Sequence, residues 1–278
     1  MPEKFNLKKL ANKKIAVVGC GWLGLPLAEK LIDKGNDVHG TTRSIEKLKL
    51  LKSKGINAHQ LIFDNSPIAL QWLNKCDVII LNIPPSKLQT SYAKELCKLV
   101  ENTNALAKII FISSTSVYPN NNSIVDENTP INSETKNAYA IVTAEQKIKA
   151  IVGKRLTIIR FAGLVGGERH PVKYMSGKSY ENGGAPVNLI HLEDCIQLIE
   201  SIIKEDFWGQ VINGCCSEHP SKKSYYTFAA KKLAVPPPIF KCQTKGTYKK
   251  VVSNILPTIK SFNYRYTSPY DFPLVKDC

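Results

Sequence analysis

Short apolar segments alternate with longer amphipathic segments along most of the chain, up to residue 214. The short segments are typical of buried β-strands, and the longer ones repeat apolar side chains at helical spacing. The strands are predicted at residues 13–18, 37–40, 58–63, 77–83, 108–112, 156–161 and 210–212. The helices are predicted at residues 22–34, 45–54, 86–102, 137–151 and 191–203.

This alternation is typical of a parallel sheet that is covered by helices on both faces. We therefore predict an α/β fold, a Rossmann-type doubly wound parallel sheet built from residues 13–165 and 191–214. Residues 166–190 and 215–278 break the pattern and are rich in Gly, Pro and Tyr, which predicts a small C-terminal substrate-side lobe. The polar, Lys-rich residues 1–12 are expected to form a flexible N-terminal segment.

Ligands of such sheets bind beyond the carboxyl ends of the strands, which narrows the search for functional residues. The stretches that follow the predicted strands are residues 19–24, 41–43, 64, 82–86, 113–118 and 163–170. We expect the chemistry of the protein to lie there.

A glycine-rich turn joins the first predicted strand to the first predicted helix, and it consists of Gly19, Cys20, Gly21, Trp22, Leu23 and Gly24. The first glycine permits a sharp turn, the second lets backbone N–H groups approach a pyrophosphate, and the third allows close packing of helix on strand. The N-terminus of the following helix adds a positive dipole end. A tight structural turn could use the same residues, but the strand and helix on either side favour dinucleotide binding.

The end of the second strand indicates which nicotinamide cofactor is bound. A site specific for NAD places an acidic residue about 20 residues beyond the glycines, whereas this chain has Thr41, Thr42, Arg43 and Ser44 there. The planar guanidinium of Arg43 suits a 2′-phosphate, and the neighbouring hydroxyls can donate to it. We therefore expect NADP(H) to be preferred, with NAD(H) possible. Asp64 could contact the adenine side or could belong to a turn.

The bulk composition limits the other function classes. The 278 residues carry a formal charge of +15, and residues 217–278 contain 11 Lys and Arg against 3 Asp and Glu. The lysines are scattered at surface spacing, which indicates either an ordinary lysine-rich surface or a field that attracts phosphate-bearing small molecules. We do not expect a nucleic acid as the main partner.

The same composition bears on metals and on location. The cysteines show neither a C-x-x-C pair nor zinc spacing, so no metal is expected. No signal peptide or membrane span is evident, and we expect a cytoplasmic protein with reduced thiols.

The order of the motifs resembles the extended short-chain dehydrogenase/reductases, the NAD-dependent epimerase/dehydratase enzymes that act on nucleotide sugars. The resemblance spans roughly residues 13–214, and it is closer to an atypical bacterial subgroup of that family. The stretches that carry it are Gly19–Ala28 (GCGWLGLPLA), Ser113–Tyr118 (SSTSVY), Ala162–Pro171 (AGLVGGERHP) and Val187–Asp194 (VNLIHLED).

The resemblance implies roles for residues near the strand ends. Ser114 would hold the substrate oxygen, and Ile83, Pro84 and Ser113 would line the ribose and nicotinamide. Thr115, Gly163 and Arg169 would contact the substrate, which the resemblance implies is a nucleotide sugar or a phosphorylated sugar-like alcohol. The family's usual dimer packs on a helix pair that includes residues 137–151, so a homodimer is possible.

The family's catalytic Tyr–Lys pair is incomplete in this chain. If Tyr139 is the tyrosine, the lysine position holds Thr143; if the helix is aligned on Ala144–Gln146, the two positions hold Asn137 and Ile141. Both alignments lack the lysine that favours the phenolate of a tyrosine, whose pKa is otherwise ~10.

Three possibilities follow from the missing lysine. Tyr139 could act with another cation. Another group could serve instead, and the candidates are Tyr118, Glu168, Arg169 and His170. The protein could also bind NADP(H) as a silent sensor or scaffold. Fold membership does not choose among them, because function depends on the site.

Overall fold

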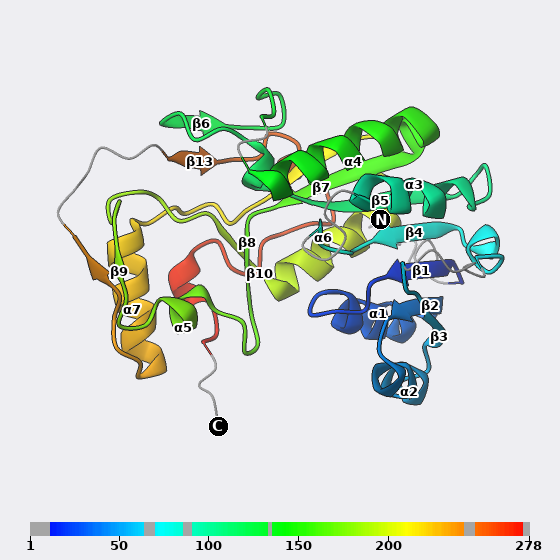
Figure 1. Cartoon of the computed structure of the whole chain (residues 1–278), viewed down its shortest axis with the longest axis horizontal. Coiled ribbons are helices and arrows are strands. Elements are labelled where there is room, and N and C mark those ends of the chain that lie inside the picture. Colours follow the sequence, from blue (N-terminus) through cyan, green and yellow to red (C-terminus); the bar gives the residue numbers. More distant parts are fainter. Residues whose placement is uncertain (1–11, 64–69, 86–90, 133–134, 242–247, 275–278) are drawn as a thin grey trace, which may run out of the picture. The chain divides into compact units, whose positions relative to one another are not determined.

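The computed structural model describes residues 12–63, 70–85, 91–132, 135–241 and 248–274. Its main feature is a seven-stranded parallel sheet with the order β11-β7-β5-β4-β1-β2-β3, which confirms the predicted α/β fold of Rossmann type (Figure 1). The strands are β1 (Lys14–Val18), β2 (Asp37–Thr42), β3 (Asn57–Gln60), β4 (Val78–Leu81), β5 (Lys108–Ser114), β7 (Leu156–Phe161) and β11 (Val211–Gly214).

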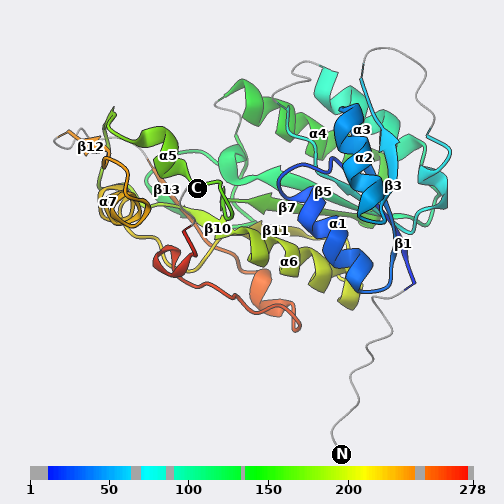
Figure 2. The ribbon, with the colours of Figure 1, turned by 90° about the horizontal axis from the view of Figure 1, so that it is seen from below.

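The helices between these strands lie where the periodicity predicts them. They are α1 (Gly24–Asp33), α2 (Ile45–Ser53), α3 (Tyr92–Glu101), α4 (Lys136–Val152) and α6 (Leu192–Glu205). α3 and α4 pack against each other on one face of the sheet, and α1 lies on the opposite face (Figure 2). Residues 86–90, at the start of the predicted helix 86–102, lie outside the described residues.

Burial on both faces explains why the sheet strands are apolar. All four residues of β4 (Val-Ile-Ile-Leu) are buried, as are Ile15 to Val18 of β1. A parallel strand covered by helices on both sides has no solvent face, so it lacks the alternation of polar and apolar residues. Leu27, Ala28 and Leu31 of α1 are buried at helical spacing.

Short elements that the sequence pattern did not reveal complete the chain. They are β6 (Ser123–Val125), β8 (Gly163–Val165), α5 (Pro171–Met175), β9 (Ser179–Tyr180), β10 (Leu189–His191), α7 (Lys222–Leu233), β12 (Ile239–Phe240) and β13 (Lys249–Val251). Single 3₁₀ turns occur at Leu73–Lys75, Thr115–Val117, Gly153–Arg155, Leu256–Thr258 and Pro269–Asp271. Three two-stranded parallel pairs join β8 to β10, β9 to β12 and β6 to β13.

The chain divides into two compact units. The first contains residues 1–113, 133–159 and 199–211, and the second contains residues 114–132, 160–198 and 212–278. The second unit has its own core, in which Val172 of α5, Leu189 of β10 and Tyr225 of α7 are buried. It includes both segments that the sequence predicts for the substrate-side lobe.

Two further properties concern the described residues only. None of their helices has the length and apolar character that a membrane crossing requires. Their six cysteines are free thiols, and five of them are buried.

Two histidines on the neighbouring strands β2 and β3 share a hydrogen bond in the first unit. His39 Nδ1 lies 2.9 Å from His59 Nε2, and the two rings are within 10° of parallel. The Trp72 indole stacks on His59, with ring centroids 4.0 Å apart. Asp37 Oδ2 lies 3.8 Å from His39 Nε2. Burial lowers the pKa of His59 to about 4 and also lowers the pKa of His39.

We expect this histidine pair to make folding stability depend on pH. The folded pKa of each histidine lies below the unfolded value of ~6.5, so the unfolded chain takes up protons first as the pH falls. The pair's contribution to stability is complete above that value and is lost as the pH falls toward about 4. The melting temperature of wild-type protein should therefore drop between about pH 7.5 and about pH 5. The melting temperature of His59→Phe should drop less over the same pH range. An equal drop in both proteins would contradict a role of the histidine pair in this pH dependence.

Candidate functional site

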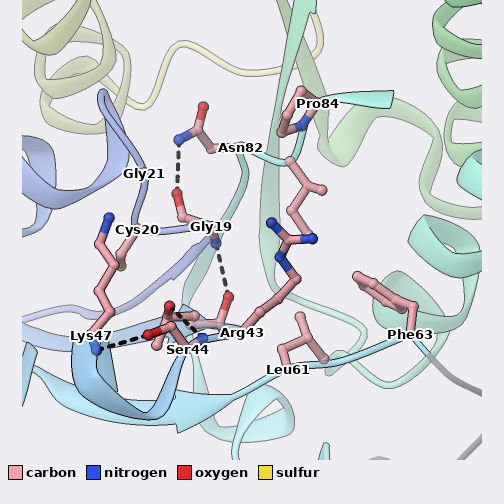
Figure 3. Close-up of a pocket in the computed structure, with 13 residues that line it drawn as sticks. Gly19, Cys20, Gly21, Arg43, Ser44, Lys47, Leu61, Phe63, Asn82 and Pro84 are labelled. Carbon is pink, nitrogen blue, oxygen red and sulfur yellow. Dashed lines mark hydrogen bonds between the residues drawn. The ribbon is translucent and has the colours of Figure 1, made fainter. Parts of the chain in front are cut away.

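A pocket of about 300 Å³ lies in the first unit, at the carboxyl ends of β1, β2 and β4 (Figure 3). Its lining residues come from the glycine turn, the β2–α2 connection, the segment after β3 and the end of β4. They are Gly19, Cys20, Gly21, Thr41, Thr42, Arg43, Ser44, Lys47, Leu61, Phe63, Asn82, Ile83 and Pro84. The pocket therefore lies where ligands of parallel sheets bind.

The glycine turn presents the N-terminal end of α1 without a competing protein group. No side chain caps the start of this ten-residue helix, and no acidic residue lies in its first turn. The positive end of the helix dipole is therefore not offset locally, which suits an anion.

Each glycine of the turn has a distinct steric role. Gly19 has φ +104°, and a Cβ there would lie 2.5 Å from the carbonyl oxygen of Asn82. A Cβ on Gly24 would lie 2.2 Å from the Gly19 carbonyl oxygen. A Cβ on Gly21 would meet no protein atom within 4 Å. The protein's own packing thus requires glycine at the first and third positions, whereas the second leaves open space for a ligand.

The charged wall of the pocket is formed where β2 passes into α2. Arg43 and Lys47 line this wall, and among the described lining residues none is acidic. The Ser44 hydroxyl donates to Glu46 Oε2 at 2.5 Å and accepts from the Lys47 N–H. This hydroxyl is therefore already donating within the chain, which leaves the two cations as the principal anion-binding groups of this wall.

The remaining wall is apolar or neutral. Leu61, Phe63 and Ile83 give it a surface that suits a flat aromatic base (Figure 3). Burial raises the pKa of the Cys20 thiol to about 11, so this group is uncharged at neutral pH. The pocket therefore offers both cationic groups and an apolar surface to a ligand.

The pocket brings together eight of the residues predicted to bind the cofactor: Gly19, Cys20, Gly21, Thr42, Arg43, Ser44, Ile83 and Pro84. Trp22, Leu23, Gly24 and Ser113 do not line it, and Asp64 lies outside the described residues. Sequence reasoning did not identify Lys47, Leu61 or Phe63. Lys47 lies in the first turn of the helix predicted at residues 45–54, four residues after Arg43, and this position could have indicated it.

A buried hydrogen bond lies at the end of β5 in the first unit. The Ser113 hydroxyl donates to Glu145 Oε1 of α4 at 2.6 Å, and both residues are buried. Tyr139 is on the same helix but is 63% exposed, and the Thr143 hydroxyl donates to its carbonyl oxygen at 2.8 Å. Thr143 thus provides no charge near Tyr139, and the role of Tyr139 stays a prediction.

Ser114 and Thr115 begin the first segment of the second unit. The Ser114 Oγ accepts the Ser116 N–H at 3.1 Å and caps the 3₁₀ turn Thr115–Val117. Ser114 is half-buried and Thr115 is buried. The Ser114 hydroxyl can still donate its proton to a ligand, since its oxygen acts here as the acceptor.

Tyr118 is enclosed in a polar network inside the second unit. Its hydroxyl accepts from Arg160 Nη1 at 2.9 Å and donates to Asn213 Oδ1 at 2.8 Å. The Arg160 guanidinium carbon lies 5.1 Å from the centroid of the tyrosine ring. Burial raises the pKa of Tyr118, against the lowering effect of Arg160. With 1% exposure and both hydroxyl functions bonded, this geometry favours a structural role over acid–base catalysis.

His170 is also bonded at both ring nitrogens. Nδ1 accepts the Val172 N–H at 3.1 Å and caps α5, and Nε2 lies 2.8 Å from the Tyr225 hydroxyl. Burial lowers its pKa to about 4, which keeps the ring neutral. The capping bond needs Nδ1 unprotonated, so Nε2 carries the proton that Tyr225 accepts. This arrangement favours a structural role, and a catalytic role stays a prediction.

Two of the residues expected to contact the substrate, Gly163 and Arg169, are exposed in the second unit, whereas Thr115 is buried. Arg169 is exposed in a tight turn in which the Gly166 and Arg169 backbones exchange hydrogen bonds of 3.0 and 3.1 Å. Gly163 begins β8, and a Cβ there would lie 2.7 Å from the Leu189 side chain.

Comparison with known sequences indicates that the chain binds a nicotinamide dinucleotide. Residues 14–132 match a family model described as the NAD binding domain of 6-phosphogluconate dehydrogenase. The chain is 32% identical over 273 residues to Protein YeeZ of Escherichia coli strain K12. That alignment covers 94% of this chain and 99% of the Escherichia coli protein. The chain is therefore an NAD(P)-binding protein of Rossmann type.

Solved structures share the fold at low sequence identity. A functionally unknown conserved protein from Silicibacter pomeroyi DSS superposes with a TM-score of 0.74 at 19% identity, covering 93% of this chain and 96% of the other. UDP-glucuronic acid 4-epimerase from Bacillus cereus, solved in complex with NAD, superposes with a TM-score of 0.73 at 19% identity, covering 93% of each chain. These similarities concern the fold.

Gly19 and Gly21 have different surroundings, so the same substitution is expected to have different effects at the two positions. Gly19→Ala should lower the free energy of unfolding by about 2 kcal/mol or more, because it combines a positive φ with a backbone clash. Gly21→Ala should stay within about 0.5 kcal/mol of wild type and should weaken nucleotide binding. Urea unfolding checks the first effect and fluorescence titration with NADPH the second. Equal destabilisation by the two substitutions would show that this assignment of roles is wrong.

Proposed function

Because the chain belongs to the same family as the Escherichia coli Protein YeeZ and is an NAD(P)-binding protein of Rossmann type, we propose that it is an NADP(H)-dependent oxidoreductase or epimerase-like enzyme. Its proposed substrate is a nucleotide-linked or phosphorylated sugar. The observation that carries the proposal is the pocket in which the glycine turn faces Arg43 and Lys47 with no acidic side chain among its described lining residues.

The chain's own groups fit the parts of the cofactor. The backbone N–H groups of the glycine turn and the uncapped α1 would bind the pyrophosphate, since Gly21 leaves open space there. Arg43 and Lys47 would bind the 2′-phosphate, while Leu61, Phe63 and Ile83 would contact the adenine. When bound, the cofactor supplies hydride transfer.

The second unit supplies the support for an anionic substrate. Its residues 217–278 carry a net charge of +8, and Arg169 is exposed in a turn after β8. The Ser114 hydroxyl would donate to the substrate oxygen. Thr115 and Gly163 would contact the substrate. The fold is shared with UDP-glucuronic acid 4-epimerase, whose substrate is of this anionic class.

The choice of cofactor is tested with Arg43→Ala. Charge-assisted hydrogen bonds contribute ~1.5–3 kcal/mol, so NADPH binding should weaken at least about tenfold while NADH binding changes little. Fluorescence titration of both nucleotides measures this. Lys49→Ala removes a positive charge from α2, outside the pocket, and should change neither affinity by more than about twofold. Failure of wild-type protein to bind either nucleotide would overturn the proposed cofactor.

A second candidate function is a silent NADP(H) sensor or scaffold. It is favoured by the side chains at the possible lysine positions: Thr143 bonds to the helix backbone, and Ile141 is buried and apolar.

Turnover separates the two functions. We expect wild-type protein to convert UDP-glucuronic acid or a related UDP-sugar in the presence of NADP, as followed by nucleotide absorbance and product chromatography. Ser114→Ala should abolish conversion because the substrate oxygen loses its donor. Ser116→Ala, which removes a neighbouring exposed hydroxyl, should retain it. Tight NADPH binding without turnover of any sugar nucleotide would favour the sensor.

A further inference from the structure

Two side chains from neighbouring strands hold the first residue of the glycine turn. The Thr41 hydroxyl, at the end of β2, accepts the Gly19 N–H at 2.9 Å, and the Thr41 carbonyl accepts the Cys20 N–H at 2.9 Å. On the other side, the Asn82 side-chain amide, just after β4, donates to the Gly19 carbonyl at 2.9 Å (Figure 3). The turn is therefore bonded to both strands that flank β1.

The position of these two side chains is itself fixed. Thr41 is 2% exposed, and the Asn82 N–H donates to the Val18 carbonyl at 2.9 Å. The Gly19 carbonyl accepts a second bond from the Gly21 N–H at 2.8 Å. This bond and the Asn82 bond orient the Gly19–Cys20 and Cys20–Gly21 peptide groups relative to the sheet.

We propose that Thr41 and Asn82 are positioning residues of the nucleotide site, which fix the backbone of Gly19, Cys20 and Gly21 so that the start of α1 is presented to a pyrophosphate. This inference rests on the proposed cofactor site and assigns its geometry to two side chains outside the glycine motif. Preorganised donors bind an anion more tightly because their ordering precedes binding.

The role of these residues differs from that of Arg43 in a measurable way. NADPH, NADH and ADP-ribose share the pyrophosphate. Loss of the hydrogen bonds that join Thr41 or Asn82 to Gly19 should therefore weaken the binding of all three ligands by the same factor. 2′-AMP has no pyrophosphate and should be affected little. Loss of Arg43 acts instead on the ligands that carry a 2′-phosphate.

The test uses full-length Thr41→Val, Thr41→Ser, Asn82→Ala and Asn82→Leu proteins, with calorimetric titration of the four ligands. Thr41→Val keeps the shape of the side chain and removes its acceptor, and Thr41→Ser keeps the acceptor. Asn82→Leu removes the donor without adding a charge. We expect Thr41→Val and Asn82→Ala to bind NADPH, NADH and ADP-ribose about five- to tenfold more weakly, as the loss of one or two hydrogen bonds implies. Thr41→Ser should stay within about twofold.

A matched control separates positioning from general destabilisation. Asn104 braces another loop of the first unit, with its amide donating to the carbonyls of Cys76 at 3.0 Å and Asn74 at 3.2 Å. Asn104→Ala should lower the melting temperature without changing any of the four affinities.

Three results would overturn the inference while the proposed cofactor stands. They are unchanged affinities in Thr41→Val and Asn82→Ala, a loss confined to NADPH, and an equal loss for 2′-AMP. If either variant fails to fold, Thr41→Ser and Asn82→Leu, which removes the donor without adding a charge, decide: the inference requires near-wild-type binding by the first and weakened pyrophosphate binding by the second. Wild-type protein that binds none of the four ligands would overturn the proposed cofactor and this inference with it.

Discussion

The turn between β1 and α1 is built where backbone segments approach too closely for a side chain to separate them. A Cβ on Gly19 would lie 2.5 Å from the Asn82 carbonyl oxygen, and one on Gly24 would lie 2.2 Å from the Gly19 carbonyl oxygen. β1 and β4 are paired and buried, so their ends cannot move apart to relieve such a clash. The pocket depends on this constraint, because it places α1 and its free N-terminal end directly at the edge of the sheet.

Charge acts on the site at two ranges. The formal charge of +15 creates a field that attracts anions but does not orient them. Orientation comes from Arg43 and Lys47, which line one wall of a pocket that has no acidic side chain among its described lining residues. The Cys20 thiol stays neutral because burial raises its pKa to about 11, so it does not oppose an anion. Both ranges therefore favour a phosphate-bearing ligand.

In the second unit, burial distinguishes polar side chains that are bonded inside the protein from those that can still bond to a ligand. Tyr118 and His170 follow strand ends, where catalytic groups are common, yet both have their polar atoms bonded inside the protein. Burial raises the pKa of Tyr118 and lowers that of His170, which favours the neutral form of each. Ser114 differs, because its oxygen accepts one backbone N–H and its proton remains able to donate.

The sequence by itself determined the seven strands of the sheet, the helices between them and the glycine turn. These features depend on local periodicity and on the unique backbone of glycine, so they can be recognised without knowing any distant contact. The sequence spacing alone also showed that the end of the second strand carries Arg43 and lacks an acidic residue.

Only the tertiary structure decided which polar groups face the pocket and which face the interior. Lys47, Leu61 and Phe63 reach the pocket from α2 and the segment after β3, and Asn82 bonds to Gly19 across 63 residues. The Ser113 hydroxyl of β5 donates to the buried Glu145 of α4. A side chain's direction and burial depend on contacts between segments far apart in the chain, and neither hydrophobic periodicity nor motif spacing contains that information.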